Sequence, residues 1–328
     1  MYNKRIVFDI DDTISFTTNR DWVNAKPNQP IIDKINKLYN EGWEVFLHTA
    51  RGSISAPENA DKKYRSIIET WMKSHNVQYH ELIFGKPLAV YYVDDKALTP
   101  EDFLSVEIEE LKGMSGATIF RAGDQVHKTA DNTEDVIKWF DLSKSSSLCT
   151  PKIHKVVGKT ISMEYINENC KIDYDILLNQ LEENGRYFHH KIPDFSTYIE
   201  RVKSHNQDKK YLTLLEKYSD FYNKNKSFCH GDASIDNVLC RDKTLYFIDP
   251  IYLPDVYSSW LLDVSKTLCS LKRFDEKDSY SYILERYSNI KNELQILELS
   301  HWIRMMKYHP DPNKVKFEMG CLYESIKD

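Results

Sequence analysis

The amino-acid sequence predicts two consecutive domains: an α/β domain with a parallel sheet, then an α+β domain with a small β-rich lobe and a larger helical lobe. A chain of 328 residues is longer than a single domain with one hydrophobic core usually is. Short β-branched runs alternate with helical patterns from residue 5 to about 95. From about residue 172 the pattern is mainly helical. These three observations carry the prediction.

The elements predicted for the first domain alternate in type. In chain order they are strand, helix, strand, helix and strand, at residues 5–10, 30–42, 43–48, 64–71 and 89–93. Pro30 suits the first turn of the first helix, and Gly42 ends that helix. Strand–helix–strand units of this size imply a Rossmann-like parallel sheet with right-handed crossovers.

Polar side chains follow the strands of this predicted sheet. They are Asp9, Asp11, Asp12, Thr49, Asp94 and Asp95. In open parallel sheets the ligand site lies beyond the carboxyl ends of the strands, so we expect a site where these side chains meet. A strand that ends in Asp-x-Asp is also common as a turn or a helix cap, and that interpretation stays open for Asp12.

Four short segments at these strand ends carry a resemblance. Their sequences are DIDDT, VFLHT, FGKP and VDD, at residues 9–13, 45–49, 84–87 and 93–95. In this order they resemble the four motifs of haloacid dehalogenase-like (HAD) phosphatases. One helix fills most of the interval between the first two motifs, so the resemblance implies a HAD-like domain that is essentially capless.

The resemblance implies hydrolysis of a phosphate ester through an aspartyl-phosphate. Asp9 would attack phosphorus, and Asp11 would protonate the leaving oxygen and later activate water. Thr49 and Lys86 would bind the phosphoryl oxygens and offset charge in the transition state.

Carboxylates crowded at one sheet edge repel one another unless a cation lies between them. We therefore expect Mg²⁺ among Asp9, the backbone carbonyl of Asp11, and Asp94 or Asp95.

The second domain is expected to begin after residue 108, in an acidic connector over residues 101–112 that should be irregular. A hairpin is predicted over residues 117–129, with its turn at Gly123. Two short strands interrupt the helical region, near residues 237–240 and 244–248. The predicted first domain, small lobe and helical lobe therefore cover residues 1–108, 109–166 and 167–328.

The most specific segment of the chain is FCHGDASIDNVL, at residues 228–239. It resembles the catalytic loop of aminoglycoside phosphotransferase and choline kinase-like enzymes. The resemblance extends from about residue 110 to residue 328 and implies a two-lobed, protein-kinase-like domain. Asp232 would accept or orient the proton of a substrate hydroxyl, and Asn237 with Asp249 would bind Mg²⁺.

The same resemblance makes ATP the expected phosphate donor. Lys128 stands where the phosphate-binding lysine belongs, and Gly116 lies in a short glycine loop before it. The backbone around Glu164 and Ile166 would hold the adenine. Two features depart from the pattern: the Phe and Gly that follow the metal-binding Asp in protein kinases are absent, and the glutamate partner of the lysine has only Glu134 as its nearest candidate.

Composition excludes several classes of partner. Hydrophobic residues make up 41% and charged residues 29% of the chain, as in ordinary soluble proteins. The net charge of −6 shows no basic footprint for nucleic acid. No apolar run approaches the roughly 20 residues of a membrane helix, so membrane insertion is not expected. Six scattered cysteines without a C-x-x-C pair favour reduced thiols and a cytoplasmic location.

Together the resemblances predict a bifunctional enzyme, a Mg²⁺-dependent phosphatase joined to an ATP-dependent small-molecule kinase. The two activities make sense at different positions of one phosphorylated sugar or polyol. Paired steps of this kind are similar to those of bacterial capsule biosynthesis, so surface-polysaccharide precursor synthesis is the expected setting. The alternative is a HAD phosphatase regulated by a nucleotide-binding pseudokinase domain. The sequence identifies neither the substrate nor an oligomeric state.

Overall fold

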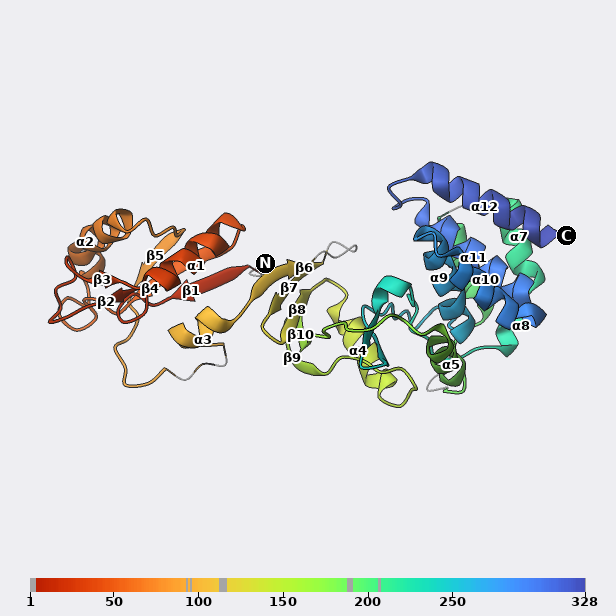
Figure 1. Ribbon diagram of the computed structural model, residues 1–328, viewed down its shortest axis with the longest axis horizontal. Helices are drawn as coiled ribbons and strands as arrows, with labels where there is room; N and C mark the ends of the chain where they lie inside the picture. Colours follow the sequence, from red (N-terminus) through yellow and green to blue (C-terminus); the bar gives the residue numbers. More distant parts are fainter. Residues whose placement is uncertain are drawn as a thin grey trace. The chain divides into compact units, whose positions relative to one another are not determined.

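The computed structural model describes residues 4–92, 94, 96–111, 117–187, 191–205 and 208–327. Contacts divide the chain into two units, the first with residues 1–114 and 118–123, the second with residues 115–117 and 124–328. Figure 1 shows the chain with most of its helices and strands labelled. The first unit extends past residue 108 because β6 (Ile108–Leu111) pairs antiparallel with β7 (Thr118–Ala122).

A three-stranded parallel sheet forms the centre of the first unit. Its strand order is β1-β4-β5, over Arg5–Phe8, Glu44–Thr49 and Glu81–Phe84. The middle strand β4 buries Val45 and Leu47, as expected for a strand in a sheet that helices cover. A short antiparallel pair, β2 (Ser15–Phe16) with β3 (Lys26–Pro27), follows β1 in the chain.

The two helices predicted for this unit are present as α1 and α2. α1 (Gln29–Asn40) has Pro30 in its first turn, where the missing N–H removes no helical hydrogen bond. The side chains that α1 buries recur at helical spacing and are Ile31, Ile32, Ile35 and Leu38. α2 (Ala60–Ser74) adds Ile68 and Trp71 to the same core.

Two expectations for the end of this unit are wrong. Residues 89–92 form no strand, and Val90 and Tyr91 are 88% and 84% exposed; residue 93 lies outside the described residues. An apolar run becomes a strand only where a neighbouring strand pairs with it, and among the described residues this sheet ends at β5. The connector over residues 101–112 is not irregular either, because α3 (Pro100–Ser105) precedes β6.

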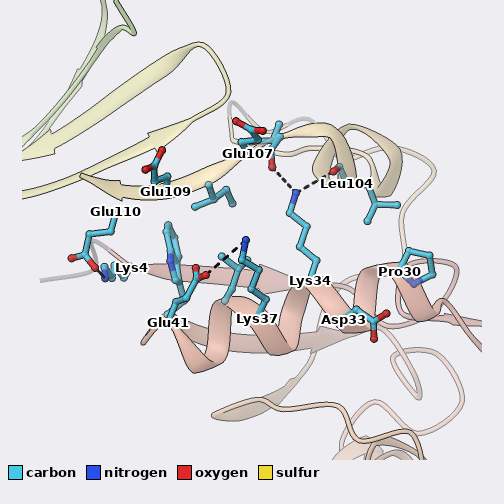
Figure 2. Close-up of a pocket in the computed structure, with 14 residues that line it drawn as sticks. Lys4, Pro30, Asp33, Lys34, Lys37, Glu41, Leu104, Glu107, Glu109 and Glu110 are labelled. Carbon is cyan, nitrogen blue, oxygen red and sulfur yellow. Dashed lines mark hydrogen bonds and ion pairs between the residues drawn. The ribbon is translucent and has the colours of Figure 1, made fainter. Parts of the chain in front are cut away.

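A pocket of the first unit lies between α1 and the segment from α3 to β6, as Figure 2 shows. There Lys34 Nζ donates hydrogen bonds to the backbone carbonyls of Phe103, Leu104 and Val106. The last carbonyls of a helix lack partners within the helix, so the ammonium group caps the end of α3. One side chain of α1 thus fastens the α3–β6 segment.

Lys34→Met is expected to destabilise the first unit by about 1–3 kcal/mol, because the carbonyl groups at the end of α3 lose their donor. Denaturant unfolding followed by circular dichroism measures the change. The matched control is Lys37→Met on the same helix, whose exposed ammonium lies 3.9 Å from Glu41 Oε1. Such a surface pair contributes little, so equal losses in both variants would contradict the capping role.

The second unit begins with an antiparallel sheet. Its strands pair in the order β8-β10-β9, over Gln125–Thr129, Thr160–Glu164 and Ile153–Val157. α4 (Thr133–Ser143) follows β8 and buries Trp139 completely. The strands expected over residues 117–129 are present as β7 and β8, and the turn between them holds Gly123 at a φ of +63°.

The rest of the second unit is mainly helical, as predicted. Helices α5 to α12 cover Tyr174–Asn184, Phe195–Lys203, Lys209–Lys217, Ser219–Lys224, Trp260–Arg273, Lys277–Arg286, Lys291–Met305 and Pro312–Lys327. The expected strand pair is β11 (Val238–Arg241) with β12 (Thr244–Phe247). α9 and α11 pack side by side (Figure 1), and residues 294–303 of α11 are all buried. In the described part of the chain, no helix has the length and apolar character needed to cross a bilayer.

The structure corrects the expectation that all six cysteines are reduced thiols. Cys170 and Cys240 form a disulfide, although 70 positions separate them in the sequence. Cys240 lies on β11, and Asn169 beside Cys170 donates its backbone N–H to the carbonyl of Cys240. The fold brings these thiols together, so no local spacing signal such as C-x-x-C could have predicted the pair.

Candidate active sites

The carboxyl edge of the parallel sheet brings together three residues predicted for the first site. Asp9 follows β1, Thr49 ends β4, and Lys86 lies just beyond β5. Lys86 Nζ is 3.1 Å from Asp9 Oδ1, and the Lys86 backbone N–H donates to the Thr49 carbonyl at 3.2 Å. Thr49 is fully buried, and its Oγ1 accepts the backbone N–H of Arg51 at 3.1 Å.

Asp11 is held by an arginine that the sequence motifs did not single out. Arg51 Nε and Nη2 lie 2.9 and 2.8 Å from the Asp11 carboxylate oxygens, and the Arg51 side chain is buried. Thr17 Oγ1 donates a further bond to Asp11 at 3.2 Å. A bidentate guanidinium fixes the plane of a carboxylate, so Asp11 is oriented before any ligand binds. Arg51 comes only two residues after Thr49, and that closeness was the available signal.

Of the two acids expected to complete a magnesium site, one lies among the described residues. Asp94 is exposed and accepts the backbone N–H of Lys96 at 2.8 Å, and Asp95 lies outside the described residues. No group of three or more acidic, His or Cys side chains converges among the residues that the structure describes. The donors present, the Asp9 carboxylate and backbone carbonyls, are hard oxygens of the kind Mg²⁺ prefers.

The second site is built around Asp232, in the loop before β11. Lys266 Nζ on α9 lies 2.8 Å from Asp232 Oδ1. Asn237 Nδ2 donates to the Asp232 carboxylate at 3.1 Å and to its backbone carbonyl at 3.0 Å. Burial acts to raise the pKa of Asp232, but the charge and hydrogen bond of Lys266 outweigh it, and the pKa is lowered. Asp232 is therefore ionised at neutral pH.

A buried carboxylate binds the backbone of the Asp232 loop. Asp263 on α9 accepts the backbone N–H groups of His230 at 2.7 Å and Gly231 at 2.8 Å. Burial raises the pKa of Asp263 to about 7, against the effect of those two hydrogen bonds. His230 is fully buried and packs edge-on against Trp139, and burial lowers its pKa to about 4. Its neutral ring is part of the packing beneath Asp232.

Gly231→Ala is expected to displace the Asp232 loop. Gly231 has a φ of +82°, and a Cβ there would lie 2.2 Å from the Ile251 carbonyl oxygen. Strain of this kind costs about 1–3 kcal/mol, to which the backbone clash adds. Thermal unfolding measures the loss. Gly158→Ala is the matched control, because its φ of +56° is also left-handed but its Cβ would meet no atom within 4 Å. A similar small loss in both variants would contradict the clash.

Lys128 forms an ion pair with Asp249 rather than with a glutamate. Lys128 is buried on β8, and its Nζ bonds to Asp249 Oδ1. Glu134, the nearest candidate partner from the sequence, is exposed at the start of α4. Asp249 takes a left-handed φ of +57°, close to the end of β12. The oxygen donors of Asp249 and Asn237 fit Mg²⁺ in chemical type.

The residues expected around ATP have mixed surroundings. The Glu164 side chain pairs with Arg241 Nη1 at 2.8 Å, and its backbone N–H donates to the Lys152 carbonyl. Ile166 is buried after β10, and Gly116 lies outside the described residues. The backbone N–H of Tyr165 is also bonded, to the Asp124 carbonyl, so an adenine contact through a backbone N–H would begin at Ile166.

Many solved structures resemble this chain, and three of them are compared with it. A thermostable mutant of aminoglycoside phosphotransferase APH(4)-Ia matches 69% of this chain and 97% of its own, with 11% identity and a TM-score of 0.50. A choline/ethanolamine kinase family protein from Mesorhizobium loti matches 67% of this chain and 87% of its own, with 12% identity and a TM-score of 0.44. A target protein from Vibrio cholerae matches 32% of this chain and 89% of its own, with 29% identity and a TM-score of 0.30. No protein-family model and no curated protein matches the chain.

The likeness to the aminoglycoside phosphotransferase is one of fold, since only 11% of the aligned residues are identical. It spans nearly the whole of that enzyme and 69% of this chain. The larger part of this chain therefore has a kinase-like fold.

Proposed function

We propose that the chain is a bifunctional enzyme, a Mg²⁺-dependent phosphatase in the first unit and an ATP-dependent small-molecule kinase in the second. Its substrate would be a phosphorylated sugar or polyol, in the synthesis of a surface-polysaccharide precursor such as that of a capsule. The observation that carries the proposal is the Asp232 loop, in which a lysine and an asparagine hold one ionised carboxylate within a kinase-like fold.

In the kinase reaction Asp232 would act on the acceptor hydroxyl. The hydroxyl proton passes to the Asp232 carboxylate as the oxygen forms its bond to the γ-phosphorus and the bond to ADP breaks. Lys266 keeps Asp232 ionised and ready to accept that proton. Lys128 would leave Asp249 to bind the phosphates of ATP, and Asn237 with Asp249 would hold Mg²⁺. That ion would neutralise charge on the phosphates.

In the phosphatase reaction Asp9 would attack the phosphorus of the ester. A bond from Asp9 to phosphorus forms, the ester oxygen leaves, and Asp11 supplies its proton. Asp11 then takes a proton from water, which breaks the aspartyl-phosphate and releases inorganic phosphate. Lys86 and Thr49 would bind the phosphoryl oxygens, and Arg51 would hold Asp11 in line. Mg²⁺ would offset the charge that gathers near Asp9.

A second candidate is a phosphatase regulated by a nucleotide-binding pseudokinase. The pairing of Lys128 with Asp249 favours it, because the lysine has no glutamate partner among the described residues and Glu134 is exposed. The ordered contacts of Asp232 with Lys266 and Asn237 favour transfer instead, since a binding-only domain has no need of them.

Phosphorus-31 NMR of the purified chain with Mg²⁺, ATP and a panel of sugars, polyols and their monophosphates tests the proposal. The expected result is a new phosphate ester together with ADP, and inorganic phosphate lost from a different position of the same scaffold. Phosphate release with ATP left intact across the panel would favour the regulated phosphatase. A panel that yields neither product would oppose both candidates.

A further inference from the structure

A cavity beside the Asp232 loop is lined by two arginines, Arg201 from α6 and Arg304 from α11. The loop itself contributes Cys229 and Gly231 to the same cavity, and the predicted catalytic Asp232 follows Gly231 in the chain. Both arginine side chains are half-buried. The two guanidinium groups influence each other and Asp232 electrostatically, which places all three charges in one neighbourhood.

The lining of this cavity contains no carboxylate. Within the described residues, neither Arg201 nor Arg304 has an ion pair with Asp or Glu, and Asp232 pairs with Lys266 instead. Arg304 Nε is buried and has no hydrogen-bond partner. Burial, followed by the charge of Arg304, lowers the pKa of Arg201 to about 10. Two positive charges therefore line the cavity. The negative charge that acts on them, Asp232, is not part of the lining and is already paired with Lys266.

His301 holds Arg304 in place without adding charge. Its Nε2 lies 3.1 Å from the Leu262 carbonyl oxygen, which can only accept, so Nε2 carries the proton. Nδ1 is then an acceptor, and Arg304 Nη2 donates to it at 2.9 Å. Burial and the nearby arginines keep the pKa of His301 well below its ordinary value, so the ring is neutral. Arg304 is thus oriented by a neutral group through its Nη2.

We propose that Arg201 and Arg304 bind a phosphate group already present on the acceptor substrate, so that the kinase phosphorylates a hydroxyl of a phosphate monoester. The assignment of an acceptor rests on the proposed kinase function. A phosphate dianion matches two guanidinium charges and accepts paired N–H bonds from each, whereas a carboxylate would leave one charge unbalanced. The same two guanidinium charges would repel a cationic acceptor, so cationic acceptors are excluded.

Isothermal calorimetry with three probes of one carbon skeleton tests the site: glycerol, glycerate and glycerol 3-phosphate. The full chain carries Asp9→Asn and Lys86→Met, which remove hydrolysis and the phosphate-binding lysine of the first unit. Glycerol 3-phosphate is expected to bind most tightly. Arg201→Gln or Arg304→Gln should weaken its binding by about 10- to 100-fold, as loss of a charged hydrogen-bonding partner predicts. Arg201→Lys and Arg304→Lys keep the charge and should retain part of the affinity.

The matched control is Arg286→Gln, because Arg286 already pairs with Glu182 at 2.8 Å on α5 and lines no part of the cavity. Glycerate binding as tightly as glycerol 3-phosphate would overturn the phosphate assignment. Equal affinity in all arginine variants, or no binding by the parent chain, would overturn the site. If circular dichroism shows that a glutamine variant does not fold, the lysine variant at the same position is used instead. Affinities for glycerate and glycerol 3-phosphate equal to those of the parent chain would then count against the site.

Kinase activity is scored separately, as ADP formed with phosphorylated and unphosphorylated acceptors. Arginine-dependent binding of glycerol 3-phosphate without ADP formation from any acceptor would refute the proposed kinase and leave the anion site standing. ADP formation that is equally fast with unphosphorylated acceptors would refute the anion site as a substrate site and leave the kinase standing.

Discussion

Asp232→Asn is expected to lower ATP-dependent phosphoryl transfer by about 10²- to 10⁴-fold, the usual contribution of a general base. The amide has the same size as the carboxylate, and its single oxygen can still accept from Lys266 or from Asn237, but it cannot take up the hydroxyl proton. Nucleotide affinity should be retained, because Lys128 and Asp249 are unchanged. ADP formation and ATP binding, measured on the same preparation, separate the two effects.

The matched control for this variant lies in the same loop. The Asp236 carboxylate accepts a hydrogen bond from Arg273 Nη2 at 2.7 Å and has no assigned part in phosphoryl transfer. Asp236→Asn should therefore leave ADP formation unchanged. Phosphate release by the first unit should be unaffected in both variants. ADP formation by Asp232→Asn at the parent rate would show that Asp232 is not the base. Loss of both activities would refute independent sites.

The parts of the fold that could be predicted are those whose signals are local. The periodic apolar residues of α1 and the Pro30 at its start lie within one short stretch, and the structure has that helix. The strand expected at residues 89–93 failed because an apolar run does not reveal whether a partner strand is available. The Cys170–Cys240 disulfide could not be predicted because only the tertiary fold brings those thiols together.

The candidate sites divide in the same way. Asp232 and Asn237 share one loop, so their spacing could be recognised in the sequence, and the structure places them in contact. Arg201 and Arg304 lie on different helices, α6 and α11, and neither is part of a short motif. Their importance comes from a shared cavity and an unbalanced charge, and both of these are properties of packing rather than of local sequence.

Asp9→Asn is expected to reduce phosphate release by on the order of 10³-fold or more, because removal of a nucleophile leaves only the binding groups of the site. The structure adds a physical reason for a clean result. Lys86 Nζ lies 3.1 Å from Asp9 Oδ1 and can still bond to an amide oxygen, so the fold of the sheet edge should survive. ADP formation by the second unit should remain at the parent rate. Release of inorganic phosphate from phosphorylated sugars and polyols measures the first activity.

The neighbouring acid supplies the control for Asp9. Asp12 is exposed, and its left-handed φ of +59° is a conformation that asparagine also tolerates, so Asp12→Asn should preserve both the turn and phosphate release. Trapping with a phosphorylated substrate followed by mass spectrometry should find the phosphate on Asp9 in the parent chain and in Asp12→Asn, and nowhere in Asp9→Asn. A phosphorylated Asp12, or phosphate release that survives in Asp9→Asn, would move the nucleophile away from the end of β1. Asp9 would then bind metal without attacking phosphorus.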